Sequence, residues 1–241
     1  MIPLFHDFAG ETVLVVGGGS VGARKARRFA REARVVVVSP AFDARFDDAE
    51  SWGDDVEGEG AGVDLVRAAP TPDSVGEWVR RAEPVLVVAA TDDGELNAAV
   101  ERAAREAGAL VNRTDQSGGR EAGSVVVPAT VRDDPVTVAI STGGGSPALS
   151  KHLRERLEDE LAGAGAMATL SAEVRADLKA RGIAPERRRT AVRAVVRSDT
   201  VWKALRTGDS KAGQEAARVI RNELDELDAE DVGNSGGDPS R

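Results

Sequence analysis

Cysteine is absent from this chain of 241 residues. Its absence excludes disulfides, thiolate nucleophiles and zinc–thiolate sites. Aromatic residues make up only 3% of the sequence, so we expect a core built mainly from Val, Ala and Leu. The histidines, His6 and His152, lie too far apart in the sequence to form a local metal-binding motif. We therefore expect no metal site.

Positive charge is also in short supply. The chain has 32 basic and 41 acidic residues, which gives a formal net charge of −9, and lysines are a small minority of the basic residues. A general nucleic-acid binder needs a basic face that neutralises phosphates, so we expect no nucleic-acid partner. The low lysine content fits either a high-salt cytoplasm or a GC-rich genome, and the sequence does not separate these two explanations.

Long apolar runs are missing as well. No run approaches the roughly 20 residues that span a bilayer. The N-terminal stretch MIPLFHD lacks the basic flank and the long apolar core of a signal peptide. We expect a soluble, cytoplasmic protein with no membrane partner. The length and a hydrophobic content of 41% predict one large domain, or one domain with a smaller annex.

A glycine cluster near the N-terminus is the most informative feature that is present. The apolar run 13–16 leads into Gly17, Gly19 and Gly22, and a helix-like segment, 21–32, follows at once. In a dinucleotide-binding unit the first glycine permits the turn, the second admits a pyrophosphate, and the third lets helix and strand pack closely. Free N–H groups at the helix start then face the phosphates. The alternative is a glycine-rich turn without a ligand.

The first half of the chain alternates strand-like and helix-like segments. Residues 53–62 are glycine-rich and acidic, which is typical of a loop. Asp92 and Glu95 have capping-box spacing at the start of a helix that Gly108 ends. This order predicts an open parallel sheet with right-handed crossovers. The expected strands are 12–16, 34–39, 63–66, 84–90 and 109–112, and the expected helices are 21–32, 74–81 and 92–107.

The pattern changes after residue 112, where two β runs follow each other without a helix long enough for a crossover. Ser146 and Pro147 suit the N-cap and the first position of a later helix. The expected elements are β runs at 124–128 and 135–140, a helix at 148–161, helices from 167 to 227 broken near 182–185 and 207–210, and a disordered tail at 228–241.

The expected cofactor site departs from the usual dinucleotide pattern where the second strand ends. An acidic residue there normally binds the ribose 2′-hydroxyl. Here the strand ends in Ser39, Pro40 and Ala41, with no acid before Asp43. Ser39 can bond a ribose hydroxyl more weakly, and Arg45 is the one arginine placed for a 2′-phosphate. NAD is therefore favoured over NADP as the cofactor.

Loops after later strands carry further candidates. Thr91 follows the fourth strand, where a loop closes over a nicotinamide ribose, while the adjacent Asp92 is alternatively only a helix cap. Asp115 lies just beyond the fifth strand, and by spacing alone it is one surface aspartate among many. The glycines at 143–145 either aim backbone donors at an anion or form a hinge. The basic run 24–28 is either a solvated helix face or an attractor of a polyanion. The predicted cofactor-binding residues are Gly17, Gly19, Ser20, Val21, Gly22, Ser39, Pro40, Ala41 and Thr91.

Several ordered blocks of residues are more specific than the glycine cluster alone. The blocks are Pro3-Leu4-Phe5 with VVGGGSVG at 15–22 and RKA at 24–26; AATDD at 89–93 with Leu96-Asn97; Val111-Asn112 with Asp115; and PAT at 128–130, AISTGG at 139–144 and SPAL at 146–149. Together they resemble the precorrin-2 dehydrogenase family, the NAD-dependent module of siroheme synthases. The resemblance runs from residue 1 to about 161 and continues weakly through the helices.

The resemblance implies an α/β fold in which a Rossmann-type parallel sheet precedes a small β segment used for dimerisation and a C-terminal helical domain. It also implies oxidation of precorrin-2 to sirohydrochlorin, with NAD as hydride acceptor, in a homodimer. On this basis we expect an NAD-binding domain at 1–112, a β dimerisation segment with the catalytic loop at 113–145, a helical domain at 146–227 and the tail at 228–241.

The resemblance further implies site residues. In the family an aspartate just after the fifth strand is implicated in catalysis, and Asp115 matches it; a carboxylate there can accept the proton that accompanies hydride loss. The tetrapyrrole substrate carries eight carboxylates, which cations and free backbone donors would bind. The predicted substrate contacts are Arg24, Lys25, Arg113 and Arg120, with Thr142, Gly143, Gly144 and Ser146 from the second glycine cluster.

Other functions stay open at this point. Some members of the family also insert ferrous iron, and the glycine-rich stretch 116–124 replaces the proline and bulky apolar residues that members more often have. No methyltransferase domain follows, so we do not expect the fused three-activity enzyme. Alternatives from other classes are a regulatory NAD-sensing module, which usually has an acid at the end of the second strand, and an assembly protein that uses the helices.

Overall fold

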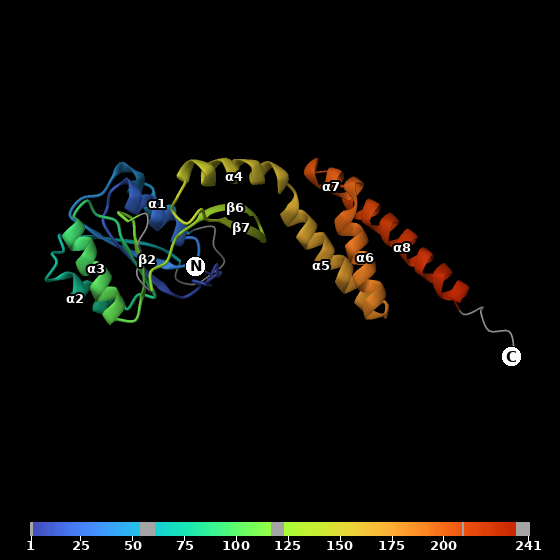
Figure 1. Ribbon diagram of the computed structural model, residues 1–241, viewed down its shortest axis with the longest axis horizontal. Helices are drawn as coiled ribbons and strands as arrows, with labels where there is room; N and C mark the ends of the chain where they lie inside the picture. Colours follow the sequence, from blue (N-terminus) through green and yellow to red (C-terminus); the bar gives the residue numbers. More distant parts are fainter. Residues whose placement is uncertain (1, 54–60, 117–122, 209, 235–241) are drawn as a thin grey trace. The chain divides into compact units, whose positions relative to one another are not determined.

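The computed structural model describes residues 2–53, 61–116, 123–208 and 210–234 (Figure 1). The chain divides into two compact units. The first contains Met1–Val127 with Gly143–Gly145, and the second contains Pro128–Thr142 with Ser146–Arg241. Within the described residues, no helix combines the length and the apolar character that a bilayer crossing requires.

The first unit is built on a five-stranded sheet in the order β3-β2-β1-β4-β5, with every neighbouring pair parallel. The strand order reverses between β1 and β4, which is where ligands bind in open α/β sheets. The open parallel sheet predicted from the alternating segments is therefore confirmed. The strands are β1 (Thr12–Val16), β2 (Arg34–Ser39), β3 (Gly62–Arg67), β4 (Leu86–Ala89) and β5 (Leu110–Arg113).

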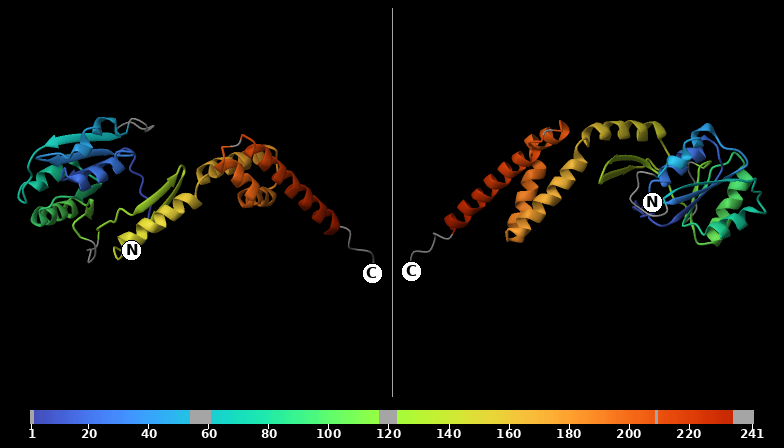
Figure 2. Two further views of the ribbon diagram at one scale, coloured as in Figure 1. Left: turned by 90° about the horizontal axis from the view of Figure 1, so that it is seen from above. Right: turned by 180° about the vertical axis from the view of Figure 1, so that it is seen from behind.

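Helices cover both faces of this sheet, which explains the continuous apolar runs of its central strands. Successive side chains of a strand point to opposite faces. Val13 and Val15 therefore pack with α1 (Ser20–Phe29), and Leu14 and Val16 pack with α2 (Val75–Ala82) and α3 (Gly94–Glu106). Figures 1 and 2 show the layers. Two short 3-10 helices, η1 (Ala44–Phe46) and η2 (Ala49–Ser51), close the face of α1.

The start of α3 corrects one detail of the sequence prediction. The N-cap is Asp93 and not Asp92: its carboxylate accepts the N–H groups of Glu95 at 2.8 Å and Leu96 at 3.0 Å. Gly108 follows the helix with a φ of 74°, as predicted for a residue that ends it. Of the predicted loop 53–62, residues 54–60 lie outside the described part of the chain, and Gly62 already begins β3.

The second unit begins with an antiparallel pair, β6 (Ala129–Asp133) and β7 (Val136–Ile140). The sequence placed the first of these strands at 124–128, which is wrong. Pro128 has no N–H to donate to a ladder, and the segment before it instead runs beside β5, with an isolated parallel bridge between Val111 and Ser124. The strand prediction missed this because residues 124–128 are as apolar as a true strand.

Five helices complete the second unit. Ser146 caps α4 through Leu149 N–H, and Pro147 is its first residue, as predicted. The predicted breaks near 182–185 and 207–210 are confirmed, and Ser198 adds another between α6 and α7. The last helix continues to Asn234, so the first residues of the tail predicted as disordered from 228 are helical, and Arg187 forms an ion pair with Asp228 there. Residues 235–241 lie outside the described part. The helices are α4 (Pro147–Glu160), α5 (Ala164–Ala180), α6 (Pro185–Arg197), α7 (Asp199–Arg206) and α8 (Ala212–Asn234).

Candidate active site

The glycine turn after β1 is fixed by close contacts with its neighbours. Gly17 has a φ of 121°, and a Cβ on it would overlap the carbonyl oxygen of Ala90. A Cβ on Gly18 would overlap the carbonyl oxygen of Ala41, and a Cβ on Gly22 that of Gly17. The turn, the end of β4 and the start of α1 therefore have no room for side chains at these glycines.

Gly19 differs from the other glycines of this turn. Its φ is −76°, and a Cβ on it would meet no described atom within 4 Å. It is the N-cap of α1, yet no side chain caps the helix and the first turn holds no acidic residue. The first N–H groups of α1, from Ser20 onwards, therefore meet the conditions for binding an anion. This arrangement fits the pyrophosphate of a dinucleotide.

The segment after β2 packs against the glycine turn. Ser39 is buried, while Pro40 and Ala41 are exposed. Asp43 donates its N–H to the carbonyl oxygen of Gly18 at 2.8 Å. Its carboxylate accepts the N–H of Arg45 at 3.0 Å and Nη1 of Arg45 at 2.9 Å. The backbone hydrogen bond from Arg45, followed by its side chain, lowers the pKa of Asp43 below its usual 3.8. The first acid after β2 is thus ionised and paired with the arginine considered for a 2′-phosphate.

Thr91, at the end of β4, is held by a side chain that the sequence prediction did not include. The N–H and Oγ1 of Thr91 donate to Oδ1 of Asn97 at 3.2 and 2.8 Å, and Nδ2 of Asn97 returns a bond to the Thr91 carbonyl at 3.0 Å. Asn97 is fully buried. The sequence did contain a signal for Asn97, because it is a polar residue on the face of the predicted helix 92–107 that turns toward the core. Asp92 is exposed.

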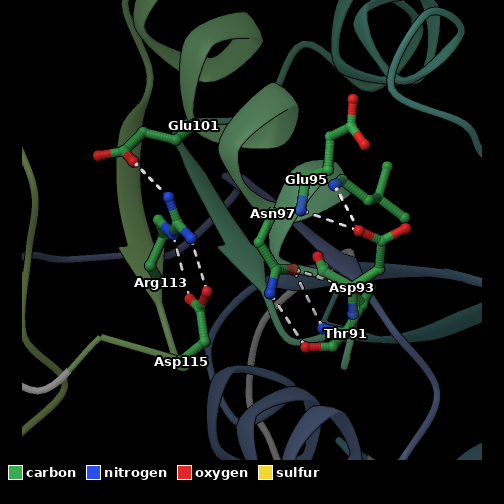
Figure 3. Close-up of polar contacts among 8 residues, drawn as sticks. Thr91, Asp93, Glu95, Asn97, Glu101, Arg113 and Asp115 are labelled. Atoms are coloured by element: carbon green, nitrogen blue, oxygen red, sulfur yellow. Dashed lines mark hydrogen bonds and ion pairs between the residues drawn. The ribbon is translucent and has the colours of Figure 1, made fainter.

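Asp115 lies beyond the end of β5, where it forms a two-pronged ion pair with Arg113 (Figure 3). Nε of Arg113 donates to Oδ1 at 3.1 Å and Nη2 donates to Oδ2 at 2.6 Å. The hydrogen bond from Arg113 is the main reason that the pKa of Asp115 lies below its usual 3.8. The carboxylate is therefore ionised at neutral pH, and its side chain keeps 30% of its surface exposed.

Arg113 also contacts a second carboxylate, which the sequence prediction missed. Its Nη1 donates to Oε2 of Glu101 on α3 at 3.1 Å, and Glu101 in turn accepts from Arg105 at 2.7 Å. Arg113 shares the face of β5 covered by α3 with Val111, two residues before it in the strand, and Figure 3 shows the Asp115 carboxylate turned toward the Arg113 guanidinium. Arg113, predicted as a substrate contact, thus lies between two carboxylates with 11% of its side chain exposed.

The other predicted substrate contacts lie in several places. Arg24 is exposed and Lys25 half-buried on α1, and Arg120 lies outside the described residues. Oγ1 of Thr142 donates to the carbonyl oxygen of Ser146 at 3.1 Å, and Gly143 and Gly144 have φ values of 65° and 86°. The side chains of Thr142 and Ser146 thus serve their own turn and helix cap. As substrate contacts all of these residues stay predictions.

The chemistry available at the sheet edge can be stated from these parts. The described residues contain no group of three or more His, Asp or Glu side chains that could hold a metal ion. They do contain an uncapped helix start beside a glycine turn, and an ionised, partly exposed carboxylate. The two lie at the carboxyl ends of strands in one sheet, which suits an anionic dinucleotide and a nearby proton transfer.

Comparison with known proteins identifies relatives along the whole chain. Residues 4–129 match a family model described as NAD(P)-binding. Residues 133–160 match a model described as the central part of a sirohaem biosynthesis protein. A siroheme synthase of Stutzerimonas stutzeri (strain A1501) is 36% identical over 92% of this chain and 44% of its own length. The chain thus spans less than half of that relative.

Two further relatives have nearly the length of this chain. A precorrin-2 dehydrogenase of Methanosarcina barkeri (strain Fusaro / DSM 804) is 31% identical over 92% of this chain and 95% of that protein. The solved structure of SirC, a precorrin-2 dehydrogenase, covers 92% of this chain with a TM-score of 0.62 and 21% identity, and so shares its fold. Because the sequence match to a named relative extends over nearly all of both proteins, this chain belongs to the precorrin-2 dehydrogenase family.

Proposed function

We propose that this chain is an NAD-dependent precorrin-2 dehydrogenase that oxidises precorrin-2 to sirohydrochlorin. The observation that carries the proposal is the match to the Methanosarcina barkeri precorrin-2 dehydrogenase over almost the full length of both chains. The open approach to Gly19 and the uncapped start of α1 support a dinucleotide as the oxidant. Together they favour this function over a regulatory NAD-sensing module or an assembly protein.

The cofactor site would be formed by the glycine turn and its neighbours. When bound, NAD supplies the two-electron oxidant that accepts a hydride from the substrate. The N–H groups that begin α1 would bind the pyrophosphate at Gly19. Ser39, Pro40 and Ala41 would lie along the adenosine ribose, and Thr91, fixed by Asn97, would lie along the nicotinamide ribose.

Asp115 would handle the proton. Precorrin-2 loses two hydrogens on becoming sirohydrochlorin: one leaves with both electrons of its bond as a hydride, and the other leaves as a proton while a new double bond forms in the macrocycle. An ionised carboxylate with part of its surface exposed can take that proton and release it to water. The products are then sirohydrochlorin, NADH and one proton.

The substrate is a polyanion, so cations near the sheet edge would bind it. Arg24 and Lys25, on the first turns of α1, support this role by their charge and position. Arg120 and the second glycine cluster remain further candidates. If Arg24 and Lys25 bind the substrate, the Arg24→Gln and Lys25→Gln variants should have a raised KM for precorrin-2.

We also propose that the protein is a cytoplasmic homodimer that pairs through β6 and β7. The support for this proposal is the resemblance to the precorrin-2 dehydrogenase family, in which a small β segment serves dimerisation; β6 and β7, two strands of five residues each, stand at that place in this chain. Light scattering coupled to size-exclusion chromatography would give the mass of the assembly. A monomer at micromolar concentration would contradict the dimer without affecting the proposed activity.

The decisive experiment adds purified protein to precorrin-2 with and without NAD and follows sirohydrochlorin and NADH by absorbance. We expect equal amounts of both products with NAD and neither without it.

Asp115→Ala should lose this oxidation while it still binds NAD, as measured by tryptophan fluorescence. Asp64→Ala is the matched control, because Asp64 pairs with Arg34 at 2.7 Å on another strand of the same sheet. An inactive wild-type protein would refute the function, and a fully active Asp115→Ala variant would refute the site. A further arm that supplies sirohydrochlorin and ferrous ion without NAD tests iron insertion separately from dehydrogenation.

A further inference from the structure

Four charged side chains of alternating sign form a row that ends at Asp115. Figure 3 shows three of them, Glu101, Arg113 and Asp115. Arg105 and Glu101 come from successive turns of α3, and Arg113 and Asp115 come from the end of β5 and the residues after it. The distances between partners are 2.7 Å from Arg105 to Glu101, 3.1 Å from Glu101 to Arg113 and 2.6 Å from Arg113 to Asp115. The row has no net charge.

The middle of the row is well shielded from water. The side chains of Arg113 and Glu101 are 11% and 15% exposed, whereas that of Asp115 is 30% exposed. Breaking the ion pairs of Arg113 would cost considerable free energy, because Glu101 and Asp115 would be left without a cation where they are only partly solvated. This cost argues against the substrate-binding role predicted for Arg113, since a substrate carboxylate would have to displace Glu101 or Asp115.

The planar guanidinium is well suited to holding a carboxylate in one orientation. Arg113 contacts both oxygens of Asp115 through Nε and Nη2, and this two-pronged geometry fixes rotation as well as distance. Glu101 holds Nη1 on the opposite side of the same group. Glu101 on α3 thus holds the Arg113 guanidinium in place from the side opposite Asp115.

We propose that Arg113, held by Glu101, is a positioning residue that fixes the Asp115 carboxylate for proton transfer. The inference rests on the proposed function, because it takes Asp115 as the proton acceptor. Among the described residues, the charged groups that face Asp115 are Arg113 and, behind it, Glu101 and Arg105. Removal of Arg113 would leave Glu101 as the nearest charge, so the pKa of Asp115 would rise.

The test compares Arg113→Gln and Arg113→Lys with Arg34→Gln. Arg34 is the matched control, since it makes a similar ion pair with Asp64 at the opposite end of its strand, where the side chain is 60% exposed. Two measurements are needed for each protein. One is a carbon-13 NMR titration of the Asp115 carboxyl without substrate, and the other is kcat and KM for precorrin-2 as a function of pH.

In Arg113→Gln we expect Asp115 to titrate at a higher pH and the acid limb of the kcat profile to move in the same direction. At neutral pH kcat should fall about 10- to 100-fold, the cost of a misplaced reacting group. KM should change by less than about twofold, because the interaction lost acts in the transition state. In Arg113→Lys the Asp115 titration should return part of the way toward that of the wild type, because a lysine keeps the positive charge. The kcat should stay below the wild-type value, because a lysine cannot contact both carboxylate oxygens in a fixed plane. Arg34→Gln should match the wild type in both measurements.

A raised KM with an unchanged kcat and an unchanged Asp115 titration would overturn the proposal and make Arg113 a substrate ligand. If Arg113→Gln does not fold, Arg113→Lys decides the question by the same split between KM and kcat. The titration needs no turnover. An inactive wild-type protein would therefore refute the proposed function while the NMR result still decides whether Arg113 controls Asp115.

Discussion

Gly22 lies directly against the backbone of Gly17, so that a Cβ on Gly22 would overlap the Gly17 carbonyl oxygen. Gly17 is in turn pressed against the carbonyl of Ala90 at the end of β4. These contacts join β1, α1 and β4 at the point where the strand order of the sheet reverses. The spacing of the glycines is therefore first a packing requirement, and only Gly19 leaves open space for the proposed dinucleotide.

Replacement of Gly22 by alanine should destabilise the protein. The new methyl group meets backbone, which cannot rotate away as a flexible side chain could, so α1 must shift from the sheet. Overpacking of this kind costs about 1–3 kcal/mol. Denaturant unfolding followed by tryptophan fluorescence would measure the loss, and an unchanged midpoint would contradict the contact.

Replacement of Gly19 by alanine should have the opposite pattern. A Cβ there meets no described atom within 4 Å and the φ of −76° suits any residue, so stability should be unchanged. The methyl group would instead occupy the approach of the pyrophosphate and weaken NAD binding by about tenfold, or ~1.4 kcal/mol. NAD titration of both variants separates the two glycines. Equal NAD affinity in Gly19→Ala and the wild type would place the phosphates elsewhere.

The sequence predicted the layered sheet because its signals are local and repeated. The valine-rich strands, the glycine turn and the capping residues Ser146 and Gly108 each specify a nearby backbone conformation, and these features agree with the structure. The misplaced strand at 124–128 shows the limit. Its apolar pattern was correct, but pairing depends on a partner elsewhere in the chain, and Ser124 pairs with Val111 instead of entering the hairpin.

The candidate site was predictable only in its backbone parts. The glycine turn follows from the glycine spacing after the first strand, and the end of β4 follows from strand order. Asp115 was singled out by the family resemblance, because its spacing alone did not distinguish it from other surface aspartates. Asn97 and Glu101 were not predicted as site residues, because a helix residue becomes part of a site only through the face that it turns toward the sheet. Arg113 was predicted for its charge, but its burial between two carboxylates depends on α3 packing over β5, which no local pattern specifies.

Replacement of Asn97 by alanine should cost stability and loosen the Thr91 loop. The variant leaves the half-buried Thr91 N–H and carbonyl without the partners they have at 3.2 and 3.0 Å, and it removes the fully buried side chain of Asn97. An unpaired buried group costs about 1–3 kcal/mol. Asn222→Ala is the matched control, because Asn222 is an exposed asparagine within α8. Equal unfolding midpoints for the two variants would refute the structural role of Asn97.

Asp115 should make folding stability depend on pH in the acid range. Its pKa is lower in the folded protein than the usual 3.8, chiefly through the hydrogen bond from Arg113. A lowered folded-state pKa means that the ionised group stabilises the fold above the unfolded value and that this contribution disappears as pH falls through the folded value. The stability difference between wild type and Asp115→Asn should thus be constant above about pH 5 and shrink below about pH 4. Unfolding curves across this range would measure it, and a difference that grows on acidification would contradict the shift.

Asp43 should set the preference for NAD over NADP. It stands just after β2, where the adenosine ribose is expected, and its carboxylate holds Nη1 of Arg45 at 2.9 Å. Asp43→Ala would remove a negative charge and release a guanidinium that can bind a 2′-phosphate. We expect kcat/KM with NADP, relative to NAD, to rise about tenfold, the value of one charge-assisted hydrogen bond.

Asp47→Ala is the matched control, because Asp47 is an exposed aspartate at the other end of η1 and its removal changes the net charge equally. If both variants raise the ratio alike, long-range charge explains the preference; if neither does, Arg45 does not reach the 2′ position. Only a rise confined to Asp43→Ala supports the view that an aspartate four residues past the end of the strand replaces the usual acid by restraining an arginine.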